Sequence, residues 1–280
     1  MHSHIVHEAE TPQRSAVVFD TPHSGIVLPD HFRYACRHED LMHLHDPHIE
    51  KLLADIPATG APVLEAMIHR TCIDLNRFHD EINPEIITGQ WPHPVRRTKH
   101  TDKKLGLFPV FAGPRSQRNR EIYSAATPLT PGEAQRRIAD YHAPYYASLK
   151  DLMNTASRLH GHALHVDVHS FYRRPEHKDV LTDIILGDMN GTTCSPCISS
   201  TASAYLKTHG LSVSFNGPDF SGGALIQTTA DMESLHHSLQ VEIARDLYMD
   251  PDTLELDEAK SRRIKDALTG LSKKLILLMK

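Results

Sequence analysis

Short apolar segments that are typical of β-strands alternate along this chain with longer segments of helical periodicity. Strands are expected at residues 15–20, 62–68, 162–168, 180–186, 211–215, 224–228 and 238–243. Helices are expected at residues 47–55, 130–161, about 198–209 and 257–279. This alternation predicts an α/β sandwich with a mixed, mostly parallel sheet.

The helix expected from residue 130 has clear signals at its start and an interruption inside it. Thr130 is predicted to cap this helix, Pro131 suits its first turn, and Glu133 completes a capping box. Pro144 is predicted to kink the same helix, because proline cannot donate a backbone hydrogen bond.

The length of 280 residues, with 40% hydrophobic residues, fits a single domain over residues 1–280. Residues 1–14 are expected to be a flexible N-terminal segment. Residues 83–130 contain six prolines and few periodic positions, so we expect a long loop region near the functional site. We find no internal repeat that would divide the chain.

Charge and hydropathy exclude several classes of partner. The net charge of -5 does not suggest a nucleic-acid partner. No secretory signal and no run of 18 apolar residues is present, so we expect a cytoplasmic protein without a membrane partner. The four cysteines do not form a disulfide framework, and Cys194 and Cys197 are read as reduced thiols in a loop rather than as a zinc or redox site.

Reactive side chains follow several of the expected strands, where α/β proteins collect their functional groups. His23 follows the first strand, and Asp167 and His169 lie on one face of the central strand. Two imidazoles and one carboxylate form a common catalytic zinc set, so His23 and His169 are candidate ligands of Zn²⁺ or another divalent metal. Asp167 and His169 are alternatively a hydrogen-bonded pair in the core.

The segment from His45 to Glu50 offers the third metal ligand. Asp46 is our first choice, and His48 and Glu50 are the alternatives. Asp46 is alternatively a helix cap. Glu242 lies in the last expected strand and is a candidate general base for activating water, or else an outward-facing polar residue.

Two further pairs are candidate substrate-binding residues. Asn76 and Arg77 place an amide beside a guanidinium, which suits a carboxylate, although Arg77 could instead form a surface salt bridge with Asp74. Arg173 and Arg174 could bind a second carboxylate, or could simply be solvated.

These motifs, in this order, resemble the N-formylglutamate amidohydrolase family over roughly residues 16–250. The resemblance is carried by motifs that include Pro22-His23-Ser24-Gly25, His45-Asp46-Pro47-His48, Asp74-Leu75-Asn76-Arg77, Gly106-Leu107-Phe108-Pro109, Asp167-Val168-His169-Ser170 and Leu239-Gln240-Val241-Glu242. The family is in turn similar to zinc carboxypeptidases and aspartoacylases, which implies a phosphorylase/hydrolase-like fold, a three-layer α/β/α sandwich. Ile26 stands where carboxypeptidases have the glutamate of their HxxE ligand pair, so the carboxylate ligand stays open.

The resemblance implies a metal-dependent amidohydrolase. It implies a metal held by His23, a carboxylate and His169, a substrate carboxylate bound by Asn76 and Arg77, and Glu242 as the acid–base residue. The expected reaction is hydrolysis of an N-acyl acidic amino acid, above all N-formyl-L-glutamate, as in histidine catabolism. The alternatives are a zinc metallopeptidase acting on short peptides and a metal-free binding or regulatory protein. The sequence does not predict an oligomeric state.

Overall fold

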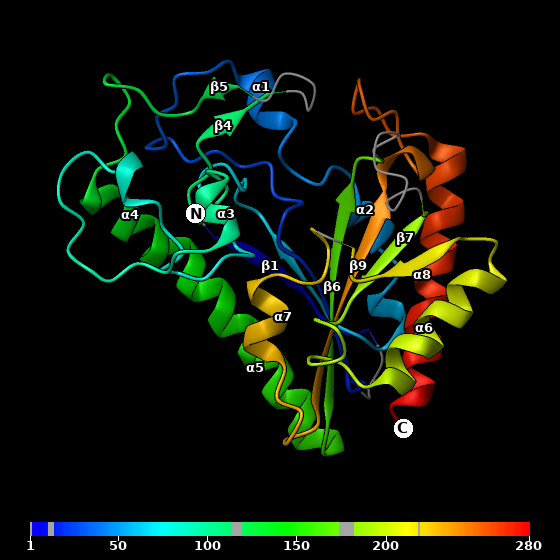
Figure 1. Cartoon of the computed structure of the whole chain (residues 1–280). Helices are drawn as coiled ribbons and strands as arrows, with labels where there is room; N and C mark the ends of the chain where they lie inside the picture. Colours follow the sequence, from blue (N-terminus) through cyan, green and yellow to red (C-terminus); the bar gives the residue numbers. More distant parts are fainter. Residues whose placement is uncertain (1, 11–13, 114–118, 174–181, 218) are drawn as a thin grey trace. The chain divides into compact units, whose positions relative to one another are not determined.

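Seven strands form one sheet in the order β1-β3-β2-β6-β9-β7-β8 (Figure 1). The computed structural model describes residues 2–10, 14–113, 119–173, 182–217 and 219–280. The strands are β1 (His4–His7), β2 (Val17–Thr21), β3 (Val63–Ala66), β6 (Ala163–Phe171), β7 (Ile184–Gly187), β8 (Val213–Phe215) and β9 (His236–Ala244). Strand β2 pairs in parallel with β3 and β6, β6 pairs in parallel with β9, and β7 runs antiparallel to β9. The predicted mixed, mostly parallel sheet is confirmed.

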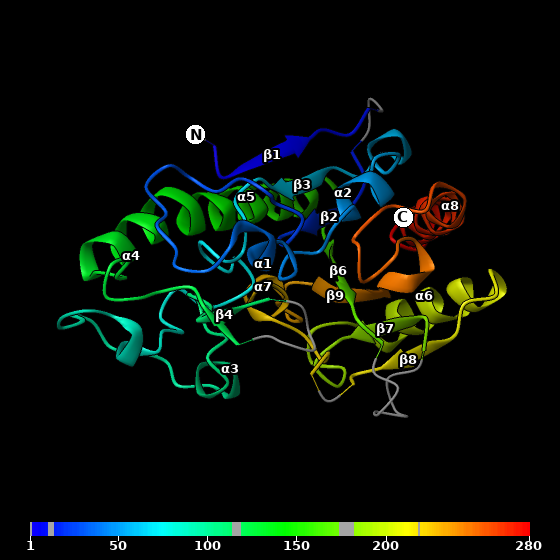
Figure 2. The same cartoon turned by 90° about the horizontal axis from the view of Figure 1, so that it is seen from above.

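Helices lie on both sides of the sheet, which gives the predicted α/β/α layers. Helices α6 and α8 lie on one side of β6 and β9, and α5 and α7 lie on the other (Figures 1 and 2). The helices are α1 (His38–Met42), α2 (Ile49–Leu52), α3 (Lys99–Asp102), α4 (Pro131–Arg137), α5 (Ala143–His160), α6 (Pro196–Thr208), α7 (Ala224–Thr229) and α8 (Glu258–Leu278). Short turns of other helical types are η1 (Pro57–Thr59), η2 (Pro84–Ile86), η4 (Ile138–His142) and η6 (Arg245–Leu247).

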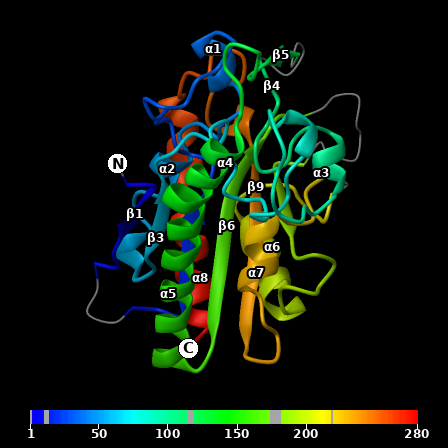
Figure 3. The ribbon, with the colours of Figure 1, turned by 90° about the vertical axis from the view of Figure 1, so that its left-hand side faces the viewer.

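The two faces of the central strands carry different side chains. Strands β6 and β9 run side by side over nine residue pairs (Figure 3). One face contributes Val166, Val168, Leu239, Val241 and Ile243 to an apolar core that also includes residues of α6 and α8. The opposite face carries the polar members of the alternation, which are buried as well: Asp20, His165, Asp167, His169, Ser238, Gln240 and Glu242. Burial of so many polar groups on one face requires specific partners for them.

The chain divides into two compact units. One comprises residues 1–5, 22–45 and 66–147, and the other comprises residues 6–21, 46–65 and 148–280. The first unit contains residues 83–113 and 119–130, with the two-stranded ribbon of β4 (Phe111–Ala112) and β5 (Arg120–Glu121). Within it, the buried Arg137 donates to the Cys72 carbonyl (3.0 Å) and to the Tyr123 hydroxyl (3.1 Å), which ties this region to α4. The single-domain prediction is untested by these observations.

Three local predictions from the sequence were wrong or incomplete. Residues 224–228 form the start of helix α7 instead of a strand, because a short apolar run does not distinguish the two by periodicity. Helical backbone runs from α4 through η4 into α5, so Pro144 lies inside one continuous helical segment. The interruption of the α-helical pattern is the π-helical turn η4, which ends two residues before Pro144. Thr130 does cap α4, but the Glu133 carboxylate binds Arg137 (2.7 Å).

Two further observations concern strand β1 and the apolar character of the helices. Strand β1, which the sequence pattern did not predict, lies within residues 1–14. In the described part of the chain, no helix combines the length and the apolar character needed to cross a membrane.

Candidate functional site

The carboxyl ends of β2, β6 and β9 lie at the same edge of the sheet, because these strands are parallel. His169 on β6 is the direct partner of Glu242 on β9, and Asp167 is the direct partner of Asp20 on β2. Partners in a parallel ladder present their side chains on the same face. The expectation that Asp167 and His169 share one face is therefore met, and Glu242 joins them there.

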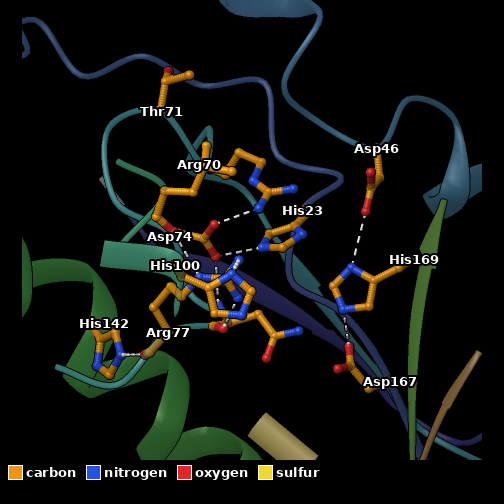
Figure 4. Close-up of polar contacts among 12 residues, drawn as sticks. His23, Asp46, Arg70, Thr71, Asp74, Arg77, His100, His142, Asp167 and His169 are labelled. Carbon is orange, nitrogen blue, oxygen red and sulfur yellow. Dashed lines mark hydrogen bonds and ion pairs between the residues drawn. The ribbon is translucent and has the colours of Figure 1, made fainter. Parts of the chain in front are cut away.

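The His169 imidazole lies between two buried carboxylates (Figure 4). Its Nδ1 is 3.0 Å from Asp46 Oδ2, and its Nε2 is 2.8 Å from Asp167 Oδ1. Burial alone would lower the pKa of His169, but the charges and hydrogen bonds of Asp167 and Asp46 raise it well above the usual value. The ring is thus held in a strongly negative environment, which suits binding of a cation.

Two donors occupy the second oxygen of Asp46. Ser170 Oγ lies 3.1 Å from Asp46 Oδ1, and Arg245 Nη2 lies 3.1 Å from the same atom. Arg245 also donates from Nε to Ser170 Oγ at 3.0 Å. All three side chains are buried. Asp46 is therefore fixed in orientation by residues from β6 and from the turn after β9.

In the other unit, Asp74 holds the His23 imidazole (Figure 4). Its Oδ1 is 2.6 Å from His23 Nε2, and its Oδ2 accepts from Arg70 Nη2 at 2.5 Å. Burial would raise the pKa of Asp74, but the positive charges of Arg70, His23 and Arg77 lower it well below the usual value. Asp74 is therefore an ionised carboxylate that holds the His23 ring through Nε2.

The chain segment that carries His23 depends on Gly25. A Cβ atom at this position would lie 2.5 Å from the Ile68 carbonyl oxygen, much closer than side-chain carbons approach backbone. The glycine lets the segment run against residues 67–68, where Val27 and Ile68 form a parallel bridge. This close approach explains the glycine in the Pro22–Gly25 motif.

Arg77 is held by neutral acceptors in the described residues. It donates to the backbone carbonyls of Leu105 (3.0 Å) and Asn76 (2.8 Å), and its Nη2 lies 3.4 Å from His100 Nδ1. Its own carbonyl accepts from His142 Nε2 at 2.8 Å and from the Tyr146 hydroxyl at 3.1 Å. Among the described residues, no carboxylate is bonded directly to the Arg77 guanidinium, so its positive charge remains suited to an anionic ligand.

His142 holds the backbone of Arg77 in place, a role that the sequence did not predict. It lies in the π-helical turn η4, and turns of this kind often mark functional sites. Burial lowers the pKa of His142 to about 4, so the ring is neutral near neutral pH and donates one hydrogen bond.

Glu242 is oriented by its neighbour on the same strand face. Gln240 Nε2 donates to Glu242 Oε1 at 2.9 Å, and both side chains are buried. The Gln240 amide therefore fixes one oxygen of the Glu242 carboxylate on the strand face that also carries His169.

The remaining predicted residues have different surroundings. Arg173 already contacts two carboxylates, with Nη2 at 2.5 Å from Asp183 Oδ1 and Nε at 2.8 Å from Asp246 Oδ1. Arg174 lies outside the described residues. Of the two alternatives to Asp46, His48 Nε2 donates to the Leu254 carbonyl (2.9 Å), and burial raises the pKa of Glu50.

His23, Asp46 and His169 are all buried, and their side chains are of the types that can hold a metal ion. The facing atoms of Asp46 and His169 are 3.0 Å apart. Neighbouring ligands at ~2.0–2.1 Å from a tetrahedral zinc ion lie roughly 3.3 Å apart, so this spacing fits. The donor set also fits, since neutral imidazole and carboxylate are usual zinc ligands.

Several supporting residues were not predicted, although the sequence contained signals for some of them. Ser170 directly follows His169, and Arg245 follows Glu242 by three positions, just past the end of β9. Asp74 was considered only as a partner of Arg77, and its contact with His23 joins positions 51 residues apart. No local pattern indicates such a contact.

The chain is similar in sequence and in structure to several known proteins. Residues 15–249 match the family model described as N-formylglutamate amidohydrolase. N-formylglutamate deformylase of Pseudomonas aeruginosa is 28% identical and aligns with 81% of this chain and 80% of its own length. The enzyme of the same name from Pseudomonas putida is 26% identical, with 90% and 89% covered. The crystal structure of N-formylglutamate amidohydrolase from Ralstonia eutropha JMP134 is similar over 100% of this chain and 99% of that chain, with a TM-score of 0.92 and 30% identity.

Proposed function

Because the chain belongs to the N-formylglutamate amidohydrolase family and is thus an enzyme acting on a linear amide, we propose that it hydrolyses N-formyl-L-glutamate to formate and L-glutamate with the help of a divalent metal ion, zinc above all. We propose His23, Asp46 and His169 as the ligands. The cytoplasmic location expected from the sequence pattern and the role in histidine catabolism implied by the family resemblance stay predictions.

One observation carries the metal proposal: each proposed histidine ligand has one ring nitrogen held by a buried carboxylate. Asp74 contacts Nε2 of His23 at 2.6 Å, and Asp167 contacts Nε2 of His169 at 2.8 Å. Histidine ligands of metals are generally oriented in this way, and the carboxylate makes the ring a better donor. Nδ1 of His169 faces Asp46 Oδ2, an atom of another proposed ligand, at 3.0 Å, so we propose Nδ1 as the metal-binding atom of His169.

The position of His23 along the chain supports its place in this set. It follows Thr21, the last residue of β2, by two positions. Strand β2 pairs in parallel with β6, the strand that carries His169. Residues just past the ends of neighbouring parallel strands are where α/β enzymes assemble their sites.

When bound, the ion would polarise the formyl carbonyl and lower the pKa of water toward ~7. Glu242 takes a proton from the attacking water on Oε2, while Gln240 holds Oε1. The new C–O bond forms at the formyl carbon, and the C–N bond then breaks. Glu242 passes its proton to the leaving nitrogen, so formate and the free amine of glutamate are released.

Arg77 and Asn76 bind the α-carboxylate of the substrate in this proposal. The contacts of Arg77 with neutral carbonyls leave its charge for the substrate anion. We also propose that Arg173 binds the side-chain carboxylate of the substrate. That carboxylate would replace Asp246, whose side chain is 47% exposed and is the more exposed of the two carboxylates that Arg173 contacts. Arg174 stays a predicted alternative.

The test is hydrolysis of a panel of amides by the purified protein, with metal content measured in the same samples. N-formyl-L-glutamate should be cleaved with a higher kcat/KM than N-formyl-L-norleucine, which has no side-chain carboxylate, and than short peptides. A preference for peptides would instead make the chain a metallopeptidase. Full activity after removal of all divalent metal would contradict the metal proposal, and absence of any hydrolysis with zinc bound would contradict the substrate.

A further inference from the structure

Arg245 and Ser170 fill the hydrogen-bonding capacity of a single oxygen of Asp46. A carboxylate oxygen has about two lone-pair sites for hydrogen bonds or metal. On Asp46 Oδ1, these face Ser170 Oγ and Arg245 Nη2, each at 3.1 Å. The other oxygen, Oδ2, is the one that faces His169.

The proton on Ser170 is directed toward Asp46. Arg245 has only donors, so its Nε–H occupies Ser170 Oγ as an acceptor at 3.0 Å. The Tyr248 hydroxyl, which neighbours Ser170, donates its own proton to the Pro47 carbonyl at 3.0 Å. The strongest acceptor that Ser170 faces is therefore the carboxylate of Asp46. Both contacts on Oδ1 are thus hydrogen bonds received by this oxygen.

Arg245 is itself held rigidly. Its side chain is buried, with 4% of the side chain exposed, and its guanidinium carbon lies 4.3 Å from the centre of the Tyr172 ring. A planar guanidinium has a fixed fork of donors, so one group reaches Ser170 and Asp46 at once. Lysine, as a single flexible point charge, would not reproduce both contacts.

We infer that Arg245 and Ser170 are positioning residues that restrict Asp46 to one-oxygen coordination through Oδ2. The inference rests on the proposed function, because it concerns the ion that Asp46 is proposed to bind. With both sites of Oδ1 filled, Asp46 adds one ligand to the two histidines, and a fourth position remains for water or substrate. A carboxylate free to bind through both oxygens would take up that position.

The experiment uses full-length protein loaded with Co²⁺, whose visible absorption reports coordination geometry. The wild type is expected to show the intense bands of a four-coordinate site. Ser170→Ala and Arg245→Lys are both expected to lose much of this intensity, because Oδ1 is released and coordination rises. Ser272→Ala is the matched control and should keep the wild-type spectrum. Ser272 is a buried serine on α8, and its hydroxyl forms a hydrogen bond with the Thr59 hydroxyl (2.7 Å).

The outcomes separate this inference from the proposed function. If the wild type binds no Co²⁺ or Zn²⁺, the metal proposal itself fails. If Co²⁺ binds and both variants keep the wild-type spectrum, the metal proposal stands and the role of Arg245 and Ser170 is wrong. A changed spectrum in Ser170→Ala but not in Arg245→Lys would show that a positive charge at position 245 is enough to hold Asp46. That result would contradict the role given to the two-pronged guanidinium of Arg245. Should Arg245→Lys fail to fold, Ser170→Ala decides.

Discussion

Replacing Asp74 by asparagine tests how the chain prepares His23 for a metal. Asp74 is buried, and its carboxylate contacts His23 Nε2 (2.6 Å) and Arg70 Nη2 (2.5 Å). Asparagine keeps the shape but removes the negative charge. The side chain then supports the His23 ring more weakly, and the charge of Arg70 lies near the proposed ion without its counter-ion.

The size of the effect follows from the number and type of the lost contacts. Removal of a carboxylate that orients a histidine ligand typically costs ~10–100-fold in metal affinity or activity. That range corresponds to about 1.4–2.7 kcal/mol. Because Asp74 also neutralises Arg70, we expect Asp74→Asn to lie at the upper end, with zinc affinity lower by about 100-fold.

The assay is competition for zinc against a chelator of known affinity, at neutral pH, with the free energy of unfolding measured in parallel. Asp40→Asn is the control, because Asp40 is equally buried in the same unit and also binds an arginine, Arg37 (3.0 Å), but no proposed ligand. Equal zinc affinities for wild type, Asp40→Asn and a folded Asp74→Asn would refute the reasoning.

Three further predictions concern catalysis, substrate binding and acid stability. Glu242→Gln should keep bound metal and lower kcat by ~10²-fold or more, and an unchanged kcat would remove Glu242 from the mechanism. Arg77→Lys should raise KM for N-formyl-L-glutamate by about 10-fold through loss of the fork, whereas a selective fall in kcat would argue against carboxylate binding. The pKa of His142 is lowered from 6.5 to about 4, so the unfolded chain binds more protons between these values. The stability from this group is present above pH ~6.5 and is lost as the pH falls toward 4, by up to about 3 kcal/mol. Urea unfolding at pH 7 and pH 4.5 should show a smaller loss for His142→Gln than for wild type, and equal losses would contradict the assignment.

The fold could be predicted from the sequence where hydrophobic periodicity was long and unambiguous. The strands predicted at residues 162–168 and 238–243 overlap β6 and β9, and the helix predicted at residues 257–279 is α8. Short elements were less predictable, because four to six residues do not distinguish a helix from a strand. Helix α7 is the clearest case, and strand β1 was missed because its exposure alternates without a strong apolar face.

The candidate site was partly predictable, because strand ends collect functional groups. His169 and Glu242 are partners on neighbouring strands, as their positions at strand ends suggested. The supporting contacts were not predictable, since they join residues far apart in the chain. Arg245 meets Asp46 across 199 positions, and His142 meets the Arg77 carbonyl across 65. Such pairs depend on tertiary structure, which no local pattern specifies.

The measurement that tests the central claim most directly is the number of divalent ions bound per chain, for wild type and for His23→Ala, Asp46→Ala and His169→Ala. The account predicts one tightly bound zinc ion per wild-type chain. It predicts loss of stoichiometric binding in each variant, with circular dichroism showing that the fold is retained. Zinc bound equally well by the wild type and by all three folded variants would contradict it.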